Sequence, residues 1–415
     1  MPELKLLFLQ MAVILAAARI MGAAFRWIGQ PEVVGEMAAG IFLGPSLLGR
    51  VAPTIMNNLF PAAALGSLSA LSQIGLVLFM FLVGLEFRPA SLRGSARAVV
   101  VASQTSILAP LLLGAALAWR LYPRMGSGAP RLPFVLFLGA AMGITAFPIL
   151  ARILADRNLT DTRVGVFAIS CAAFDDLTAW CLLAVITVIA RPDGGESPLS
   201  WRFAALAVYI LGMVFLARPV LRRTLPANAT LSLGRFGAAM VFLLLSVWVT
   251  EALQVHALFG AFLAGVVMPK GDEFQAGMRG RLESVTLALL LPLFFAFTGL
   301  RTSIGLLNTL ELWLLCGLIV TVAVGSKLLV SGLIVHAGGL PWRESLAVGV
   351  LVNTRGLVEL VILNVGLELH ILSPTLFSMM VIMALFTTLM TTPMLDWILP
   401  RLGPGSDHKD RARRI

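Results

Sequence analysis

The chain has 415 residues, of which 59% are hydrophobic and only 13% are charged, and its mean hydropathy is +0.93. A soluble globular domain carries about 25% charged residues, so this composition excludes one and indicates an integral membrane protein. The long unbroken apolar runs exclude a β-barrel and predict spanning helices. The net charge of +10 fits basic cytoplasmic loops, and we expect no nucleic-acid partner.

Apolar segments of about 20 residues predict thirteen spanning helices. They lie near residues 6–25, 31–49, 65–86, 98–119, 132–151, 164–190, 203–221, 237–253, 256–268, 284–300, 311–336, 344–367 and 375–399. The division between the eighth and the ninth is the least distinct, because only a short polar stretch separates them. Residues 1–400 are therefore expected to form one transmembrane domain, and residues 401–415 a short basic tail.

The basic residues predict how these helices are oriented in the bilayer. With the C-terminus in the cytoplasm, 20 of the 31 Lys and Arg fall on the cytoplasmic side, 8 on the other side and 3 within spans. This bias predicts an outside N-terminus and a cytoplasmic C-terminus in the inner (plasma) membrane. No loop is long enough for a soluble domain and no GxxxxGK[ST] motif is present, so we expect no ATP-driven pump, no enzyme and no cofactor.

Two of the predicted spans contain residues that interrupt helices. The fifth carries GITAFP at 143–148, and the twelfth carries NTRG at 353–356. Paired interruptions in corresponding positions of two halves indicate a transporter site, because half-helix ends present free N–H and C=O groups. The alternative is a Pro kink in one helix and a Gly packing site in the other. The residues expected near the site are Thr145, Pro148, Asn353 and Thr354.

The sixth span carries two adjacent carboxylates, Asp175 and Asp176, in the middle of an apolar run. Such residues are costly in the bilayer and mark ion pathways. Neighbours on a helix point about 100° apart, so we expect one to face a cavity and the other a supporting partner. Burial and a nearby anion both favour the protonated carboxyl, which can then exchange its proton for a cation. The alternative is a buried ion pair without a transport role.

Two further charged positions lie within the predicted spans. Lys327 sits in the middle of the eleventh span and needs a counter-ion, for which Asp175 and Asp176 are the candidates, unless it snorkels to an interface. If that pair breaks when a cation binds, Lys327 can release a proton and make the exchange electrogenic. Arg355 and Glu359 are four residues apart on the twelfth span, and we expect a supporting ion pair rather than a cation ligand.

Five stretches of the chain resemble one family of transporters. They are QPEVVGEMAAGIFLGPSLLG at 30–49, FLVGLEF at 81–87, GITAFPILARIL at 143–154, AAFDDLTAWCLLA at 172–184 and NTRGLVELVILN at 353–364. In this order they resemble the second monovalent cation:proton antiporter family, which includes sodium/proton and potassium/proton exchangers. The forms ITAFPILARIL and NTRGLVEL are most similar to the plant cation/proton exchangers and their bacterial relatives.

The resemblance implies an all-α fold of about thirteen spans, with inverted repeats and two discontinuous helices. It implies interleaved dimerisation and core subdomains within 1–400, and a homodimer. Asp176 matches the family's carboxylate that binds H⁺ and a monovalent cation, and Lys327 falls on the helix that carries the lysine partner of the electrogenic exchangers. Asp175 matches a position that is Asp in those exchangers.

We therefore expect a secondary antiporter that exchanges Na⁺ or K⁺ for H⁺ by alternating access, electrogenically. A sodium-coupled symporter of an organic anion and a cation channel are the alternatives. The sequence leaves open the choice between Na⁺ and K⁺, the stoichiometry, the pH set point and the regulation.

Overall fold

The structure is a computed structural model that describes residues 2–61, 64–86, 96–126, 128–157, 159–160, 162–190, 199–225, 231–253 and 255–399. Within these ranges the chain is helical and has no β-strand. The predicted tail at 401–415 lies outside the described residues. The all-α fold class expected from the composition is confirmed.

The helices follow one another with short connections. They are α1 (Pro2–Trp27), α2 (Glu32–Leu43), α3 (Leu48–Val51), α4 (Pro53–Leu59), α5 (Leu65–Glu86), α6 (Ala96–Met125), α7 (Arg131–Gly143), α8 (Phe147–Asp156), α9 (Arg163–Ala190), α10 (Leu199–Gly212), η3 (Met213–Ala217), α11 (Arg218–Thr224), α12 (Leu233–Ala252), α13 (Ala257–Val267), α14 (Asp272–Val285), η4 (Thr286–Leu290), α15 (Leu291–Leu300), η5 (Ile304–Leu306), α16 (Leu310–Ala337), α17 (Trp342–Val352), α18 (Leu357–Glu368) and α19 (Pro374–Ile398).

Each predicted span has a helical counterpart. Among the described residues, nine helical stretches are long and apolar enough to cross a membrane. The remaining four predicted spans correspond to α7 with α8, to α9, to α13, and to α17 with α18. The polar stretch between the eighth and ninth predicted spans is the break between α12 and α13.

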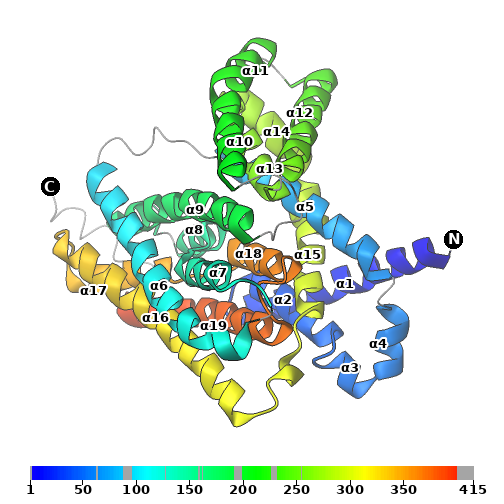
Figure 1. Cartoon of the computed structure of the whole chain (residues 1–415), viewed down its shortest axis with the longest axis vertical. Helices are drawn as coiled ribbons and strands as arrows, with labels where there is room; N and C mark the ends of the chain where they lie inside the picture. Colours follow the sequence, from blue (N-terminus) through cyan, green and yellow to red (C-terminus); the bar gives the residue numbers. More distant parts are fainter. Residues whose placement is uncertain are drawn as a thin grey trace.

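Two sets of three spans repeat one packing pattern. In the first, α6 packs on α7 and α9, and α8 packs on α9; in the second, α16 packs on α17 and α19, and α18 packs on α19. The fifth and twelfth spans are seven apart, so alternation runs them in opposite directions across the membrane, as inverted repeats require. The two sets join through α6 with α16 and α9 with α17. We call these helices, α6–α9 and α16–α19, the core group (Figure 1).

A second body consists of α1, α2, α5, α12, α13 and α15, which we call the scaffold group. Its helices pack mainly on one another, α1 and α15 on α2, and α13 on α5. At Gly84 and Gly265 the α5 and α13 backbones approach so closely that a Cβ on either residue would overlap the other helix. Lys270 fixes the same ends, because its Nζ donates to the carbonyls of Gly84, Leu85 and Gly265 at 2.9, 2.8 and 3.1 Å.

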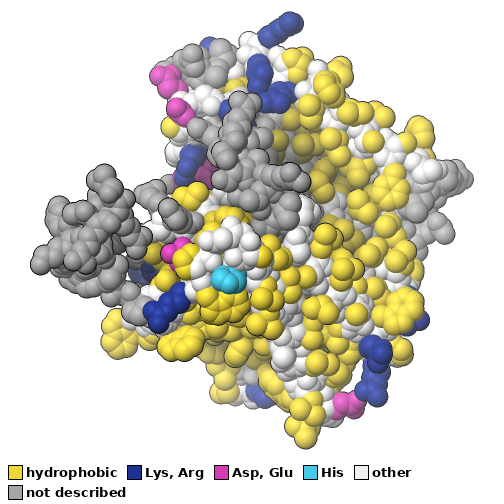
Figure 2. Space-filling model, turned by 90° about the vertical axis from the view of Figure 1, so that its left-hand side faces the viewer, with side chains coloured by type: hydrophobic (Ala, Val, Ile, Leu, Met, Phe, Trp, Pro, Cys, Tyr) yellow, Lys and Arg dark blue, Asp and Glu magenta, His cyan; other side chains and the backbone are white. Residues whose placement is uncertain are grey.

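The outer surface is apolar over a broad area. Large side chains stand exposed on several helices, among them Phe8, Trp27, Trp248 and Trp397. Figure 2 shows one face on which hydrophobic side chains spread widely, with few charges between them. Exposed apolar area on this scale is unfavourable in water and favourable against lipid chains. The chain is a multi-pass membrane protein.

Candidate functional site

The two interrupted spans break at the same place in the molecule. Residues 144–146 between α7 and α8 are not helical, nor are residues 353–356 between α17 and α18. The backbone N–H of Ala146 donates to the carbonyl of Thr354 at 2.9 Å, so the two breaks hydrogen-bond to each other. Four half-helix ends therefore meet inside the core group, where their free backbone groups and partial charges can act on buried side chains.

A glycine and a proline, Gly356 and Pro148, allow the two broken helices to cross here. A Cβ at Gly356 would overlap the end of the Ile149 side chain in α8, so a larger residue there requires Ile149 to move. Pro148 lies in the first turn of α8, where a missing N–H has no intrahelical partner to lose. The side chain of Pro148 lies outside the described part of the structure.

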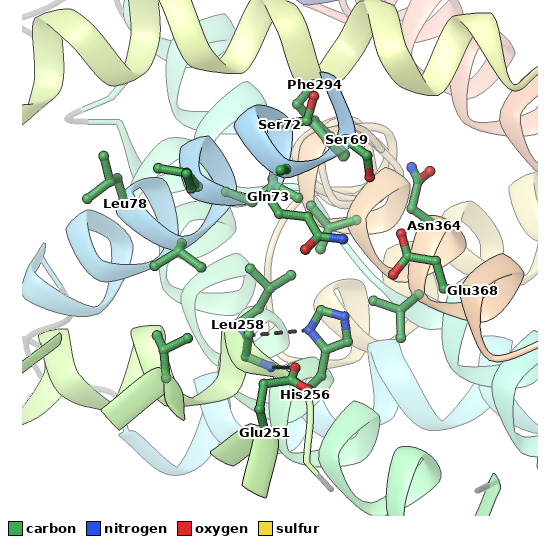
Figure 3. Close-up of a pocket in the computed structure, with 18 of the residues that line it drawn as sticks. Ser69, Ser72, Gln73, Leu78, Glu251, His256, Leu258, Phe294, Asn364 and Glu368 are labelled. Carbon is green, nitrogen blue, oxygen red and sulfur yellow. Dashed lines mark hydrogen bonds between the residues drawn. The ribbon is translucent and has the colours of Figure 1, made fainter. Parts of the chain in front are cut away.

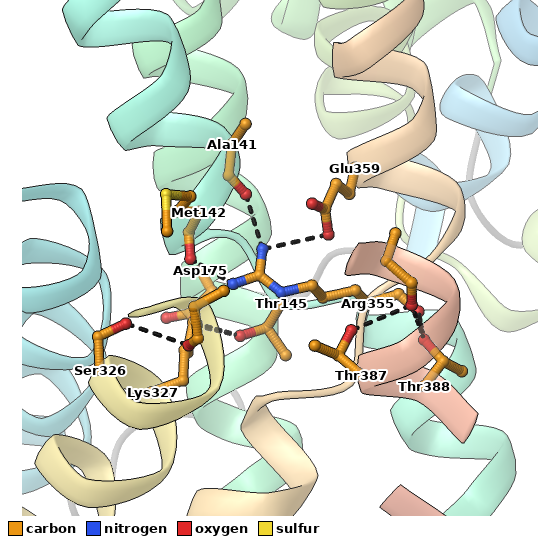
Figure 4. A network of polar contacts seen from close by, with 12 residues as sticks. Ala141, Met142, Thr145, Asp175, Ser326, Lys327, Arg355, Glu359, Thr387 and Thr388 are labelled. Atoms are coloured by element: carbon orange, nitrogen blue, oxygen red, sulfur yellow. Dashed lines mark hydrogen bonds and ion pairs between the residues drawn. The ribbon is translucent and has the colours of Figure 1, made fainter. Parts of the chain in front are cut away.

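A buried ion pair spans the first break (Figure 4). Lys327 Nζ lies 3.1 Å from Asp175 Oδ2, and both side chains are fully buried. Thr145 Oγ1 lies 2.6 Å from the same carboxylate oxygen and 2.8 Å from the carbonyl of Val352, and it accepts from Lys327 Nζ at 2.5 Å. One hydroxyl hydrogen can serve only one of the two acceptors. Of the two aspartates, Asp175 is the partner of Lys327, whose side chain is fully buried.

Asp176 faces a different environment. Its side chain is 4% exposed, and neither carboxylate oxygen accepts a hydrogen bond from the described residues. The backbone amide of Phe147, the first residue of α8, lies near this carboxylate but outside hydrogen-bond geometry. A buried carboxylate without a hydrogen-bonding partner is costly, so it favours a proton or a cation.

Arg355 connects the two broken helices. Its Nη1 donates to the carbonyl of Ala141 at 2.8 Å, and its Nη2 donates to the carbonyl of Met142 at 2.5 Å. These carbonyls belong to the last turn of α7, where backbone acceptors lack helical partners and the helix dipole is negative. Glu359 Oε2 lies 3.2 Å from Arg355 Nη1, within a fully buried pair. The guanidinium therefore caps α7 while its charge is balanced from α18.

Neutral oxygens surround the second break. Asn353 is buried, and its Oδ1 accepts no hydrogen bond within the described ranges. Thr354 Oγ1 lies 3.4 Å from the hydroxyl of Thr391 in α19. Thr388, also in α19, donates its hydroxyl to the carbonyl of Arg355. Sequence reasoning did not identify Thr388 and Thr391, because threonines are common in spanning helices.

Charge in this network does not balance. Asp175, Asp176 and Glu359 carry three carboxylates, whereas Lys327 and Arg355 carry two basic groups, and all five side chains are buried. If all five are ionised, one negative charge remains in a low-dielectric interior. A single proton or a single monovalent cation would neutralise it.

Cavities lie at both ends of α5: one between α18 of the core group and helices of the scaffold group, the other between the end of α5, α14 and α8. The first, of about 600 Å³, lies along the first half of α5 and is lined by Gln73, His256, Asn364 and Glu368 among others (Figure 3). The second, of about 680 Å³, lies at the C-terminal end of α5 and reaches Phe147 of α8. The sequence did not predict either cavity, because each is formed by helices that are distant along the chain.

Residues 13–400 match the family model of the transmembrane sodium/hydrogen exchangers. The chain belongs to the sodium/hydrogen exchanger family. It is 40% identical over 404 residues to the Na⁺/H⁺ antiporter NhaS4 of Synechocystis sp., covering 96% of this chain and 98% of that one. The resemblance expected from the five motifs is confirmed.

Two eukaryotic relatives are longer than this chain. Identity is 36% over 419 residues with cation/H⁺ antiporter 17 of Arabidopsis thaliana, covering 99% of this chain and 50% of that one. It is 30% over 410 residues with K⁺/H⁺ antiporter 1 of Saccharomyces cerevisiae, covering 96% and 47%. The chain spans about half the length of these relatives.

The fold has a counterpart among solved structures. The sodium proton antiporter MjNhaP1 from Methanocaldococcus jannaschii superposes with a TM-score of 0.67 at 16% identity, covering 97% of this chain and 100% of that one. This likeness confirms the expected antiporter fold with its discontinuous helices, and at this identity it bears on the fold alone.

Proposed function

We propose that this chain is a secondary active antiporter that exchanges Na⁺ or K⁺ for H⁺ by alternating access. The observation that carries the proposal is Asp176, a buried carboxylate without a hydrogen-bonding partner among the described residues, in a network with one excess negative charge. One proton or one monovalent cation relieves that charge, but not both at once. Exchange of the two ions requires, at a minimum, that they compete for one site, and Asp176 provides it in this proposal.

The other predicted residues have supporting roles in this proposal. Asp175 and Lys327 form the pair that responds to cation binding, with Thr145 hydrogen-bonded to both. Asn353 and Thr354 offer neutral oxygens near the breaks, which suit a partly dehydrated monovalent cation. Arg355 and Glu359 hold α7 against α18 and do not ligate the ion.

The two groups of helices support an alternating-access mechanism. The core group holds Asp176; one cavity lies between this group and the scaffold group along the first half of α5, and another lies at the C-terminal end of α5 beside α14 and α8. In this proposal the core subdomain slides against the scaffold, which serves for dimerisation, and both are interleaved within residues 1–400. Motion of the core then exposes Asp176 to each side in turn.

The membrane, the orientation and the assembly are further parts of the proposal. The charge bias supports an outside N-terminus and a cytoplasmic C-terminus in the inner (plasma) membrane. The homodimer rests on the family resemblance. C-terminal fusions to a reporter that works on one side only would test the orientation, and cross-linking in native membranes would test the dimer.

The central experiment uses purified protein in liposomes with an inside-acid pH gradient. Na⁺, K⁺ or Li⁺ is added outside and the internal pH is followed, for the wild type, Asp176→Asn and the exposed control Glu311→Gln. We expect cation-dependent alkalinisation in the wild type and the control, and none in Asp176→Asn. Full activity of Asp176→Asn would overturn the assignment. A response only with an added organic anion, or flux without proton movement, would favour the symporter or the channel.

A further inference from the structure

The cavity at the C-terminal end of α5 has charged walls. Glu86 is the last residue of α5, and Asp272, Arg279 and Glu283 belong to α14. Three carboxylates and one guanidinium thus face one space of about 680 Å³. Lys270 also lies near Glu86, but its ammonium is bound by three backbone carbonyls. Among the described residues that line this cavity, carboxylates outnumber basic side chains, and Arg279 is the basic one.

Arg279 bridges two of these carboxylates. Its Nη1 lies 3.1 Å from Glu86 Oε1. Its Nε lies 3.2 Å from Glu283 Oε2, and its Nη2 lies 3.2 Å from Glu283 Oε1. The three side chains are 45%, 43% and 39% exposed, so water reaches all of them. Ion pairs this exposed contribute little to stability, so a mobile cation can displace them.

The same cavity is lined by a neighbour of Asp176. Phe147 lines the cavity, and its backbone amide lies near the Asp176 carboxylate. Asp176 is itself buried and accepts no hydrogen bond from the described residues. This proximity is independent of the acidic lining and places the cavity beside a group that favours a cation or a proton.

We propose that Arg279 neutralises part of the negative charge of this cavity. It thereby sets the affinity for Na⁺ or K⁺ on the membrane face that carries the end of α5. The inference rests on the proposed antiport. A cation that enters must compete with the guanidinium for Glu86 and Glu283, so Arg279 lowers the cation concentration that the carboxylates would otherwise gather near Asp176. Arg279 is a specificity-determining residue of the entry path and does not touch the transported ion at Asp176.

The test compares KM for the transported cation on the two faces of the membrane. Everted and right-side-out vesicles are measured with the wild type, Arg279→Gln, Arg279→Lys and Arg281→Gln. Arg281 is the matched control, because it stands on the same helix and donates to the carbonyls of Leu231 and Ser232 at 2.6 and 3.4 Å instead. Glu86→Gln and Glu283→Gln remove negative charge, with exposed Glu273→Gln as their control.

We expect Arg279→Gln to lower KM about two- to fivefold at low ionic strength on the face that carries the end of α5. Arg279→Lys and Arg281→Gln should leave KM unchanged, and Glu86→Gln and Glu283→Gln should raise it. Added choline chloride should remove these differences, since salt screens exposed charges. If Arg279→Gln does not fold, the raised KM of the two Glu variants carries the test.

Two results would overturn the inference: an unchanged KM in Arg279→Gln and in both Glu variants, or an equal shift on both faces. Its failure differs from failure of the proposed function. A wild type that exchanges no cation for protons overturns the antiport itself. A wild type that exchanges them, with variants of unchanged KM, overturns only the role of Arg279.

Discussion

Adjacent carboxylates can have separate roles when a helix turns them about 100° apart. Asp175 is bound by Lys327 and Thr145, whereas Asp176 has no hydrogen-bonding partner among the described residues. Lys327 decides how many charges cross per cycle in the proposed exchange. If it stays protonated, one cation replaces one proton at Asp176 and no net charge moves. If cation binding breaks the pair and Lys327 loses its proton, two protons move per cation.

We expect Lys327→Gln to keep exchange but lose its electrogenicity, because the second proton carrier is absent. Proteoliposomes with a potassium-valinomycin potential measure this directly when the driving cation is Na⁺. Wild-type exchange should respond to voltage, whereas the variant should respond only to the two ion gradients. Voltage-dependent exchange that persists in Lys327→Gln would contradict the proposed role, and Ser326→Ala on the same helix is the control.

At the scale of elements, the crossing of α7–α8 with α17–α18 positions the site. Interruptions were predictable, because Gly and Pro in one span and Asn-Thr-Arg-Gly in the other disfavour a continuous helix. The acidic residues were predictable as candidates from their cost in the bilayer. The hydrogen-bond acceptors of Arg355 were not predictable, because they are the backbone carbonyls of Ala141 and Met142, which every residue type carries. The sequence likewise left open which aspartate pairs with Lys327, since that choice depends on helix rotation.

Gly356 tests how tightly the broken helices must cross. A methyl group there would overlap Ile149, so Gly356→Ala should destabilise the protein by about 1–3 kcal/mol and reduce exchange. Gly325→Ala in α16 is the control, because a Cβ there has no neighbour within 4 Å. Thermal unfolding in detergent measures the difference. Ile149→Ala should rescue part of the loss; equal stability of the two glycine variants would show that the crossing tolerates a side chain.

At the scale of the whole molecule, polar contacts cross the surface between the core and scaffold groups. Arg301 at the end of α15 reaches Asn364 Oδ1 at 3.2 Å and Glu368 Oε1 at 3.3 Å on α18. Asn364 Nδ2 donates to Thr298 Oγ1 at 2.9 Å. Asn364 and Glu368 also line the cavity along the first half of α5. In the proposed sliding motion, these directional bonds would have to break, so they hold the two groups in one register.

These contacts should stabilise the conformation in which the other cavity, at the end of α5, is accessible. Arg301→Glu and Glu368→Arg each place like charges together, and each should lower maleimide labelling of Ala276→Cys in that cavity about two- to fivefold. The background lacks Cys171, Cys181 and Cys316. The double variant Arg301→Glu/Glu368→Arg restores opposite charges and should restore labelling. If instead the two single effects add in the double variant, the contacts do not set the conformation, and shape complementarity alone must hold the two groups in register.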